Sequence, residues 1–246
     1  MKNIFLLLFC SLIFICSVSA QGIDTGIVEK AKLVVAVPHA LQLRAFNNSS
    51  QSENEYSQTP LSSQEIQKAS QSVTFERKLE SPLKNTNFYL LFFGIGASMD
   101  AYYAVCSYSD TVILYPRDSI GNNYKDNASI RFLNERLQNE PGFSPDAVMD
   151  LFIFYNKLKD PGLGWEIVLH SWKDIDWSDD EAVSQKIKNM IQPPAIKRNG
   201  NGYSVTAYVW WKARAQLRKV VFNYSGKSIS IKVVELGQYG MASALL

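Results

Sequence analysis

The sequence predicts an α+β protein with a β-rich N-terminal half, three helices and a closing three-stranded antiparallel sheet. Residues 202–236 hold three runs rich in β-branched and aromatic residues, separated by short turns, which is typical of antiparallel strands. Residues 88–93 are apolar on both sides, as in a central strand. Residues 130–158 carry apolar residues at helical spacing. We expect these three regions to form the body of the fold.

The first 20 residues are typical of a cleaved signal peptide. Lys2 precedes an apolar run at residues 4–15, and Val18 and Ala20 supply the small residues of a cleavage site before Gln21. The run is shorter than the roughly 20 apolar residues that span a bilayer, so an uncleaved anchor is the weaker alternative. We therefore expect a secreted or periplasmic protein with no stable membrane insertion after cleavage.

Cysteine usage and charge narrow the class of protein further. Cleavage removes Cys10 and Cys16, which leaves Cys106 alone and allows no internal disulfide. Bacterial lipidation of Cys16 is disfavoured because Ile15 stands where that processing needs a small residue. The 25 basic and 23 acidic residues leave the chain near neutral, with no basic run, so nucleic acid is a poor partner.

The N-terminal region after the signal peptide predicts a short β segment over residues 21–46. Leu, Val and Ala fill residues 33–37, Pro38 ends the run, and residues 41–46 alternate between apolar and polar. Two short strands fit this pattern, and the alternative is one helix over 27–46 with a kink at Pro38.

A polar segment at residues 47–64, rich in Asn, Ser, Gln and Glu, predicts a linker or a long loop before the main α+β domain of residues 65–246. It holds too few large apolar residues to offset the entropy of ordering it. At its end, Ser62 and Glu65 have the spacing of a capping box, which favours a short helix there.

The main domain begins with strands and continues with helices. Residues 73–79 alternate as a half-buried strand, and residues 102–107 and 111–115 are typical of a hairpin. One helix runs through Ile130, Leu133 and Leu137 until Pro141-Gly142 ends it. Ser144-Pro145 then starts a second helix, apolar nearly all round, which we expect to be the most buried. Residues 165–169 predict a strand, and residues 179–191 a third helix.

The first strand of the closing sheet suggests a ligand site. Trp210 and Trp211 are neighbours and must point to opposite faces. We assign Trp211 to the core face with Tyr203, Val205 and Val209. The other face is more polar and carries Ser204, Thr206, Tyr208, Trp210 and Lys212. If that face is open, Tyr208 and Trp210 form an aromatic surface for a ligand; the alternative is core packing.

A metal site can be considered in the acidic stretch that starts at His170. Three carboxylates there offer oxygen ligands: Asp174, Asp176 and Asp180. The spacing fails as a calcium loop, because Asp179 replaces the required glycine and Gln185 the final carboxylate. Ser178 and Glu181 fit a capping box better, so we expect helix capping and no metal.

Nucleophilic and cofactor chemistry have little support. His39 and His170 are the only histidines, and Cys106 lies in an apolar strand, so we interpret it as a buried structural thiol. Gly94-Ile-Gly96-Ala97-Ser98 matches neither a serine nucleophile turn nor a dinucleotide fingerprint, and we expect no cofactor.

Two classes of function therefore stay open. The first is an exported, non-catalytic binding or interaction protein for a small molecule, a glycan or a protein. The second is an exported hydrolase whose carboxylates converge only in the fold. In a eukaryotic host, four sequons could also carry glycans: Asn47, Asn48, Asn127 and Asn223.

Overall fold

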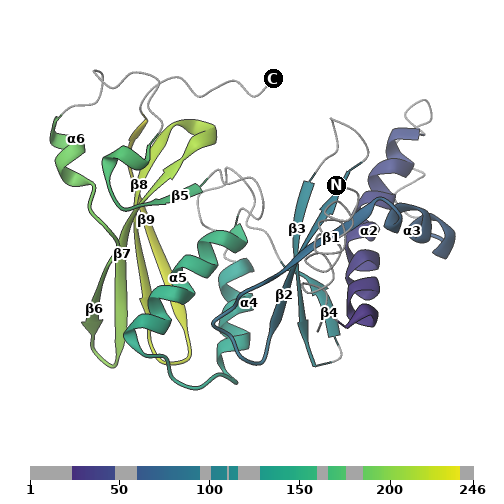
Figure 1. The fold of residues 1–246 in the computed structure, drawn as a ribbon, viewed down its shortest axis with the longest axis horizontal. Helices are drawn as coiled ribbons and strands as arrows, with labels where there is room; N and C mark the ends of the chain where they lie inside the picture. Colours follow the sequence, from purple (N-terminus) through teal and green to yellow (C-terminus); the bar gives the residue numbers. More distant parts are fainter. Residues whose placement is uncertain are drawn as a thin grey trace, which may run out of the picture.

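The computed structural model describes residues 24–47, 60–94, 101–109, 111–115, 128–159, 166–175 and 185–238. These residues form alternating layers of helix and sheet (Figure 1). Helices α4 (Ala128–Leu137) and α5 (Pro145–Lys159) lie between a four-stranded sheet, sheet 1, and a five-stranded sheet, sheet 2. Helices α2 (Thr25–Asn47) and α3 (Ser63–Ser70) pack on the far side of sheet 1, and α6 (Gln185–Met190) on the far side of sheet 2. The predicted α+β class is confirmed.

Sheet 1 is an antiparallel meander whose strands follow chain order. The strands are β1 (Val73–Leu79), β2 (Asn87–Phe93), β3 (Ala101–Tyr108) and β4 (Thr111–Leu114). In β2, Phe88 packs against α4 and α5 while Leu91 packs on the α2 side, because successive side chains point to opposite faces. The predicted central strand is confirmed, and β3 and β4 form the predicted hairpin.

Residues 25–47 form one helix, α2, so the prediction of a β segment in residues 21–46 is wrong. Pro38 lies inside this helix, where the alternative prediction placed a kink. Four residues at helical spacing are buried on sheet 1: Ala31, Val35, Ala36 and Ala40. This burial outweighs the one hydrogen bond that proline cannot donate. The outward side of α2 leaves Leu33, Val37 and Leu41 exposed.

Helix α3 starts with the predicted capping box. The Ser62 hydroxyl accepts a hydrogen bond from the Glu65 backbone N–H, and the Glu65 carboxylate accepts one from the Ser62 N–H at 2.8 Å. The last residues of the predicted linker therefore belong to α3, and residues 48–59 lie outside the described residues.

Helices α4 and α5 form the centre of the molecule because both present apolar residues to both sheets. Phe154 contacts Phe88 of sheet 1 with the ring centroids 4.9 Å apart, and Phe152 contacts Phe222 of sheet 2 at 5.6 Å. Burial on both sides explains why the sequence of α5 is apolar nearly all round, as predicted.

Sheet 2 has five strands, so the prediction of a three-stranded closing sheet is wrong in its count. The three predicted strands are present as β7 (Gly202–Trp211), β8 (Gln216–Tyr224) and β9 (Ile229–Gln238). Two short strands, β5 (Glu166–Leu169) and β6 (Ala195–Asn199), pair with the two halves of the free edge of β7. The long β7 extends beyond either partner alone, which leaves room for both.

The described residues hold five α-helices, where the sequence predicted three and a possible short one. Of the third predicted helix, over residues 179–191, the structure describes α6, and residues 176–184 lie outside the described residues. No described helix combines the length and the apolar composition needed to cross a membrane.

Candidate functional site

The two faces of sheet 2 differ in what covers them. Val205, Phe222 and Ile231 occupy one row across β7, β8 and β9 and pack in the central core against α5. Side chains alternate along each strand, so the row formed by Ser204, Asn223 and Ser230 points the other way, toward the outer face.

Trp210 lies on the outer face but is covered. Its side chain is only 4% exposed and packs in a second core, formed where α6 and the short turn at residues 172–175 lie against the upper end of sheet 2. This core includes Leu169, Ile175, Ile187, Ile191 and Leu217. The open aromatic surface considered from the sequence therefore does not extend to Trp210.

Tyr208 marks the border of the covered region. It is half-buried, packs against the second core, and pairs with Lys219 of β8. Outside the second core, the outward side chains of β6 to β9 are exposed or half-buried. We call these residues, with Tyr208, the open face. They are Ala195, Lys197 and Asn199 of β6, Ser204, Thr206 and Tyr208 of β7, Lys219, Val221 and Asn223 of β8, and Ser230, Lys232 and Val234 of β9.

The open face carries charge of one sign. Lys197, Lys219 and Lys232 come from three different strands, and none of the outward residues is a carboxylate. Hydroxyl and amide groups lie between the lysines. The face therefore combines cations, neutral hydrogen-bonding groups and the Tyr208 ring on a framework of paired strands.

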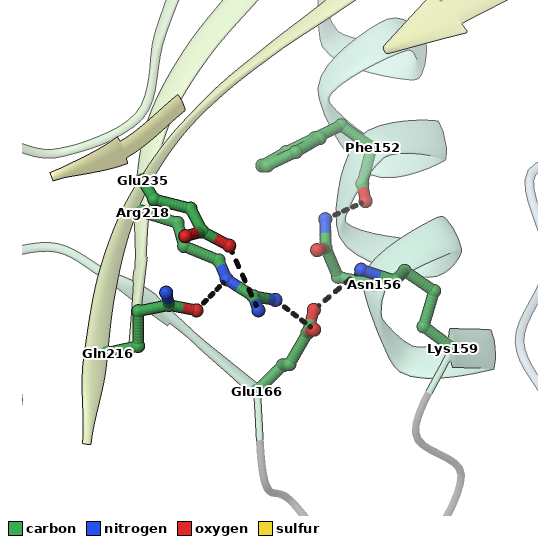
Figure 2. A network of polar contacts seen from close by, with 7 residues as sticks. All are labelled: Phe152, Asn156, Lys159, Glu166, Gln216, Arg218 and Glu235. Atoms are coloured by element: carbon green, nitrogen blue, oxygen red, sulfur yellow. Dashed lines mark hydrogen bonds and ion pairs between the residues drawn. The ribbon is translucent and has the colours of Figure 1, made fainter. Parts of the chain in front are cut away.

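The inner face holds a buried polar network at the end of α5 (Figure 2). Arg218 of β8 donates to Gln216 at 2.7 Å and to Glu166 of β5 at 3.2 Å, and Lys159 of α5 donates to the other Glu166 oxygen at 2.8 Å. Glu235 of β9 lies 4.0 Å from Arg218. The side chains of Arg218, Glu166 and Lys159 are 7%, 11% and 13% exposed, so their charges are largely removed from water.

Trp211 lies on this inner face, as predicted, and its ring contacts the network. The Arg218 guanidinium carbon is 4.0 Å from the ring centroid, and that of Arg214 is 4.8 Å away. Because the network joins the end of α5 to three strands of sheet 2, its first role is to hold that helix on the sheet. Its shortest polar contacts all join groups of the protein to one another.

This network was not predicted from the sequence. Arg218 is 52 residues from Glu166 in the chain, and Lys159 and Glu166 are seven residues apart but belong to a helix and a strand, so only the fold brings the three together. One signal was present: Arg218 shares its strand face with Val220 and Phe222, so a charged residue interrupts an apolar row.

A second candidate site is a depression of about 300 Å³ between α5 and the β1–β2 connection. Its apolar lining comes from Pro82, Ile153 and Phe154, and its polar lining includes Glu80, Asp150 and Lys157. Two carboxylates thus line one concave surface.

Glu140 holds one wall of this depression in place. Its carboxylate accepts hydrogen bonds from the backbone N–H groups of Lys84 at 3.0 Å and Asn85 at 2.9 Å. The Lys227 ammonium donates to the backbone carbonyls of Gln138, at 3.0 Å, and of Glu140. The end of α4 therefore fixes the β1–β2 connection of sheet 1 and the β8–β9 turn of sheet 2.

Cys106 is fully buried and unpaired, as predicted. It faces α4 and α5, whereas His39 packs on the other side of sheet 1, where its ring stacks on Phe93 at 3.5 Å. His170 lies beyond the end of β5 on sheet 2. Neither histidine therefore pairs with Cys106.

Native protein is expected to resist a thiol reagent at Cys106. Burial raises the pKa of the thiol to about 12, so at neutral pH almost none of it is the reactive thiolate. The measurement is the mass of the Cys106 peptide after iodoacetamide treatment, with the protein in denaturant as the fully labelled control. Rapid labelling of the folded protein would instead make Cys106 a candidate nucleophile.

Asp174 has a structural role at the end of β5. Its carboxylate accepts backbone hydrogen bonds from Ser171 at 2.9 Å and from His170 at 2.6 Å, and these lower the pKa of the carboxyl group below its usual value. Asp176, Asp180 and the predicted Ser178–Glu181 capping box lie outside the described residues. Within the described ranges, no three potential metal ligands cluster.

The remaining candidates are placed only in part. Asn223 is half-buried on the open face and Asn47 ends α2, while Asn48 and Asn127 lie outside the described residues, so glycosylation stays a prediction. Residues 95–98 of the glycine-containing segment after β2 also lie outside them.

Comparisons with family models, curated proteins and solved structures find no match to this chain. What can be said of its function therefore comes from its own geometry.

Proposed function

We propose that this chain is an exported, non-catalytic binding protein and that its ligand is a glycan bound on the open face. The main support is the composition of that face, where Thr206, Ser204 and Asn223 continue the outward surface from the half-buried Tyr208 toward the far end of β7. Hydroxyl and amide groups can exchange hydrogen bonds with sugar hydroxyls, and the tyrosine ring can pack on the apolar C–H face of a sugar.

The framework of the open face favours binding without rearrangement. Its side chains come from four hydrogen-bonded strands, and the other side of the sheet rests on the central core. Groups held on such paired strands lose little conformational freedom when a ligand binds, so less of the interaction energy is spent on ordering them.

Export is part of the proposal because of the N-terminal sequence. The apolar run at residues 4–15 and the small residues Val18 and Ala20 have the pattern of a cleavable signal peptide. Cleavage after Ala20 would release the protein outside the cytoplasm, where polysaccharides are abundant partners.

The second candidate function is an exported hydrolase, favoured by the depression beside α5. Glu80 and Asp150 both line it, from opposite walls, and Lys157 lies with them. Paired carboxylates on a concave surface can act as an acid and a base, or as an acid and a nucleophile, in glycoside hydrolysis.

Replacing Tyr208 by alanine is expected to weaken glycan binding by about tenfold or more, since the apolar contact with the sugar ring is lost. Tyr208→Phe keeps the ring and should retain most of the affinity. Affinity electrophoresis through gels that contain neutral or acidic polysaccharides gives the dissociation constants, and thermal melts check that both variants are folded.

Two results would count against this function. If no polysaccharide binds in a Tyr208-dependent manner, the open face is not a glycan site. If incubation releases reducing ends and this release is lost in Glu80→Gln or Asp150→Asn, the depression is a catalytic centre and the hydrolase alternative holds.

A further inference from the structure

We infer, building on the proposed function, that the glycan is acidic: a polysaccharide with carboxylate or sulfate groups along its chain, held by Lys197, Lys219 and Lys232. These three lysines project from the open face around its hydroxyl and amide groups. The inference names the class of ligand, which the proposed function leaves open.

The positive charge of the open face results from the arrangement of the strands and is not explained by the overall composition of the chain. The whole chain has 25 basic and 23 acidic residues, yet the outward positions of β6 to β9 hold three lysines and no carboxylate. Lys219 pairs with Val234 and Lys232 with Val221, so the two lysines are diagonal neighbours on adjacent strands. A surface with positive charges only has a positive electrostatic potential, which attracts anions.

The ammonium groups of the open face are available to a ligand. Among the described residues, no carboxylate forms an ion pair with Lys197, Lys219 or Lys232. Other lysines are engaged within the protein: Lys159 binds Glu166, and Lys227 binds backbone carbonyls. A ligand anion would therefore not have to displace an internal partner on the open face.

The spread of the lysines fits a chain-like anion. Lys197 lies opposite Ser204 of β7 and Lys219 opposite Tyr208, so the two lysines are two strands apart across the sheet and four residues apart along it, which corresponds to roughly 16 Å. Lysine ammonium groups act as separate point charges and suit anionic groups that are spaced along a polymer. A single small anion could not contact all three.

The groups between the lysines favour a sugar chain over an acidic protein. Thr206, Asn223 and Ser230 are neutral hydrogen-bonding residues, whereas the cores of protein interfaces are rich in apolar and aromatic side chains. The open face offers only Val221, Val234, Ala195 and the partly covered Tyr208 for apolar contact. The alternative, an acidic protein partner, is tested below with polyglutamate.

The test compares binding of the full secreted protein to dextran sulfate, to polygalacturonate and to uncharged dextran. We expect binding to one or both acidic polymers, weak or no binding to dextran, and weaker binding to polyglutamate of the same charge. Replacing Lys197, Lys219 and Lys232 together by glutamine should weaken the acidic-polymer affinity by about tenfold at low salt, since exposed charge pairs contribute little individually but act together. The preference between the two acidic polymers distinguishes sulfate from carboxylate recognition.

The matched control removes three exposed lysines from the opposite half of the molecule, Lys68, Lys78 and Lys84, which changes the net charge by the same amount. It should bind like the unaltered protein. Equal losses in both triple variants, no loss in the open-face variant, or equal binding of polyglutamate would overturn the inference. Binding of uncharged dextran that depends on Tyr208 but not on the lysines would overturn it and leave the proposed function standing.

Discussion

Replacing Trp210 by alanine is expected to destabilise the protein by about 3–5 kcal/mol, as much as replacing Trp211. Both rings are buried, with 4% and 7% of their surface exposed, although they point to opposite faces of β7. Trp210 fills the second core beneath α6, and Trp211 packs against the Arg218 guanidinium. The measurement is the free energy of unfolding of each variant in denaturant melts.

Val234→Ala is the control for these melts, because Val234 is 40% exposed on the open face and its loss should change stability by less than about 0.5 kcal/mol. A loss below about 1 kcal/mol in Trp210→Ala, combined with lost ligand binding, would contradict this expectation. Trp210 would then belong to the ligand surface, as the open-face hypothesis from the sequence allowed.

Replacing Glu166 by glutamine is expected to cost about 3–5 kcal/mol of stability. The carboxylate lies between the Lys159 and Arg218 cations, and its removal leaves two largely buried positive charges facing an uncharged amide. Glu235 cannot replace it, because its nearest oxygen is 4.0 Å from Arg218 and its side chain is 57% exposed. Denaturant melts at neutral pH measure the loss.

A double variant tests whether the loss of stability in Glu166→Gln comes from the excess positive charge. Arg218→Met in the Glu166→Gln background removes one of the two cations and should recover part of the lost stability. Glu29→Gln is the matched surface control, since its partner Lys32 is 3.0 Å away but Glu29 is 67% exposed, and it should cost less than about 1 kcal/mol. Equal small losses in Glu166→Gln and Glu29→Gln would mean that solvent already screens the network.

Strands with clear alternation were predictable from local pattern. In β9, Ile229, Ile231 and Val233 face the core while Ser230 and Lys232 face outward, as the sequence indicated. The capping box of Ser62 and Glu65 was also predictable, because the two residues are only three positions apart in the chain. Local patterns work here because the interacting residues are close in the chain.

The N-terminal segment shows where local pattern misleads. Its run of Val and Leu before Pro38 has strand propensity, and the helix forms because Ala31, Val35 and Ala40 fit closely against sheet 1. Packing against sheet 1 favours the helix over a strand, and this contact cannot be inferred from the sequence of the segment alone.

The α+β class, most strands and helices, the burial of Cys106 and the opposite directions of Trp210 and Trp211 were predictable from the amino-acid sequence, since they depend on composition and on the period of apolar residues. The packing of the layers was needed to see that α6 covers Trp210, that β5 and β6 extend the closing sheet, and that Arg218 and Lys159 both bind Glu166. The same holds for the three lysines of the open face, which come from different strands. Burial, charge pairing and charge clustering between distant segments depend on the register of the strands and the packing of the layers, which no local stretch of sequence specifies.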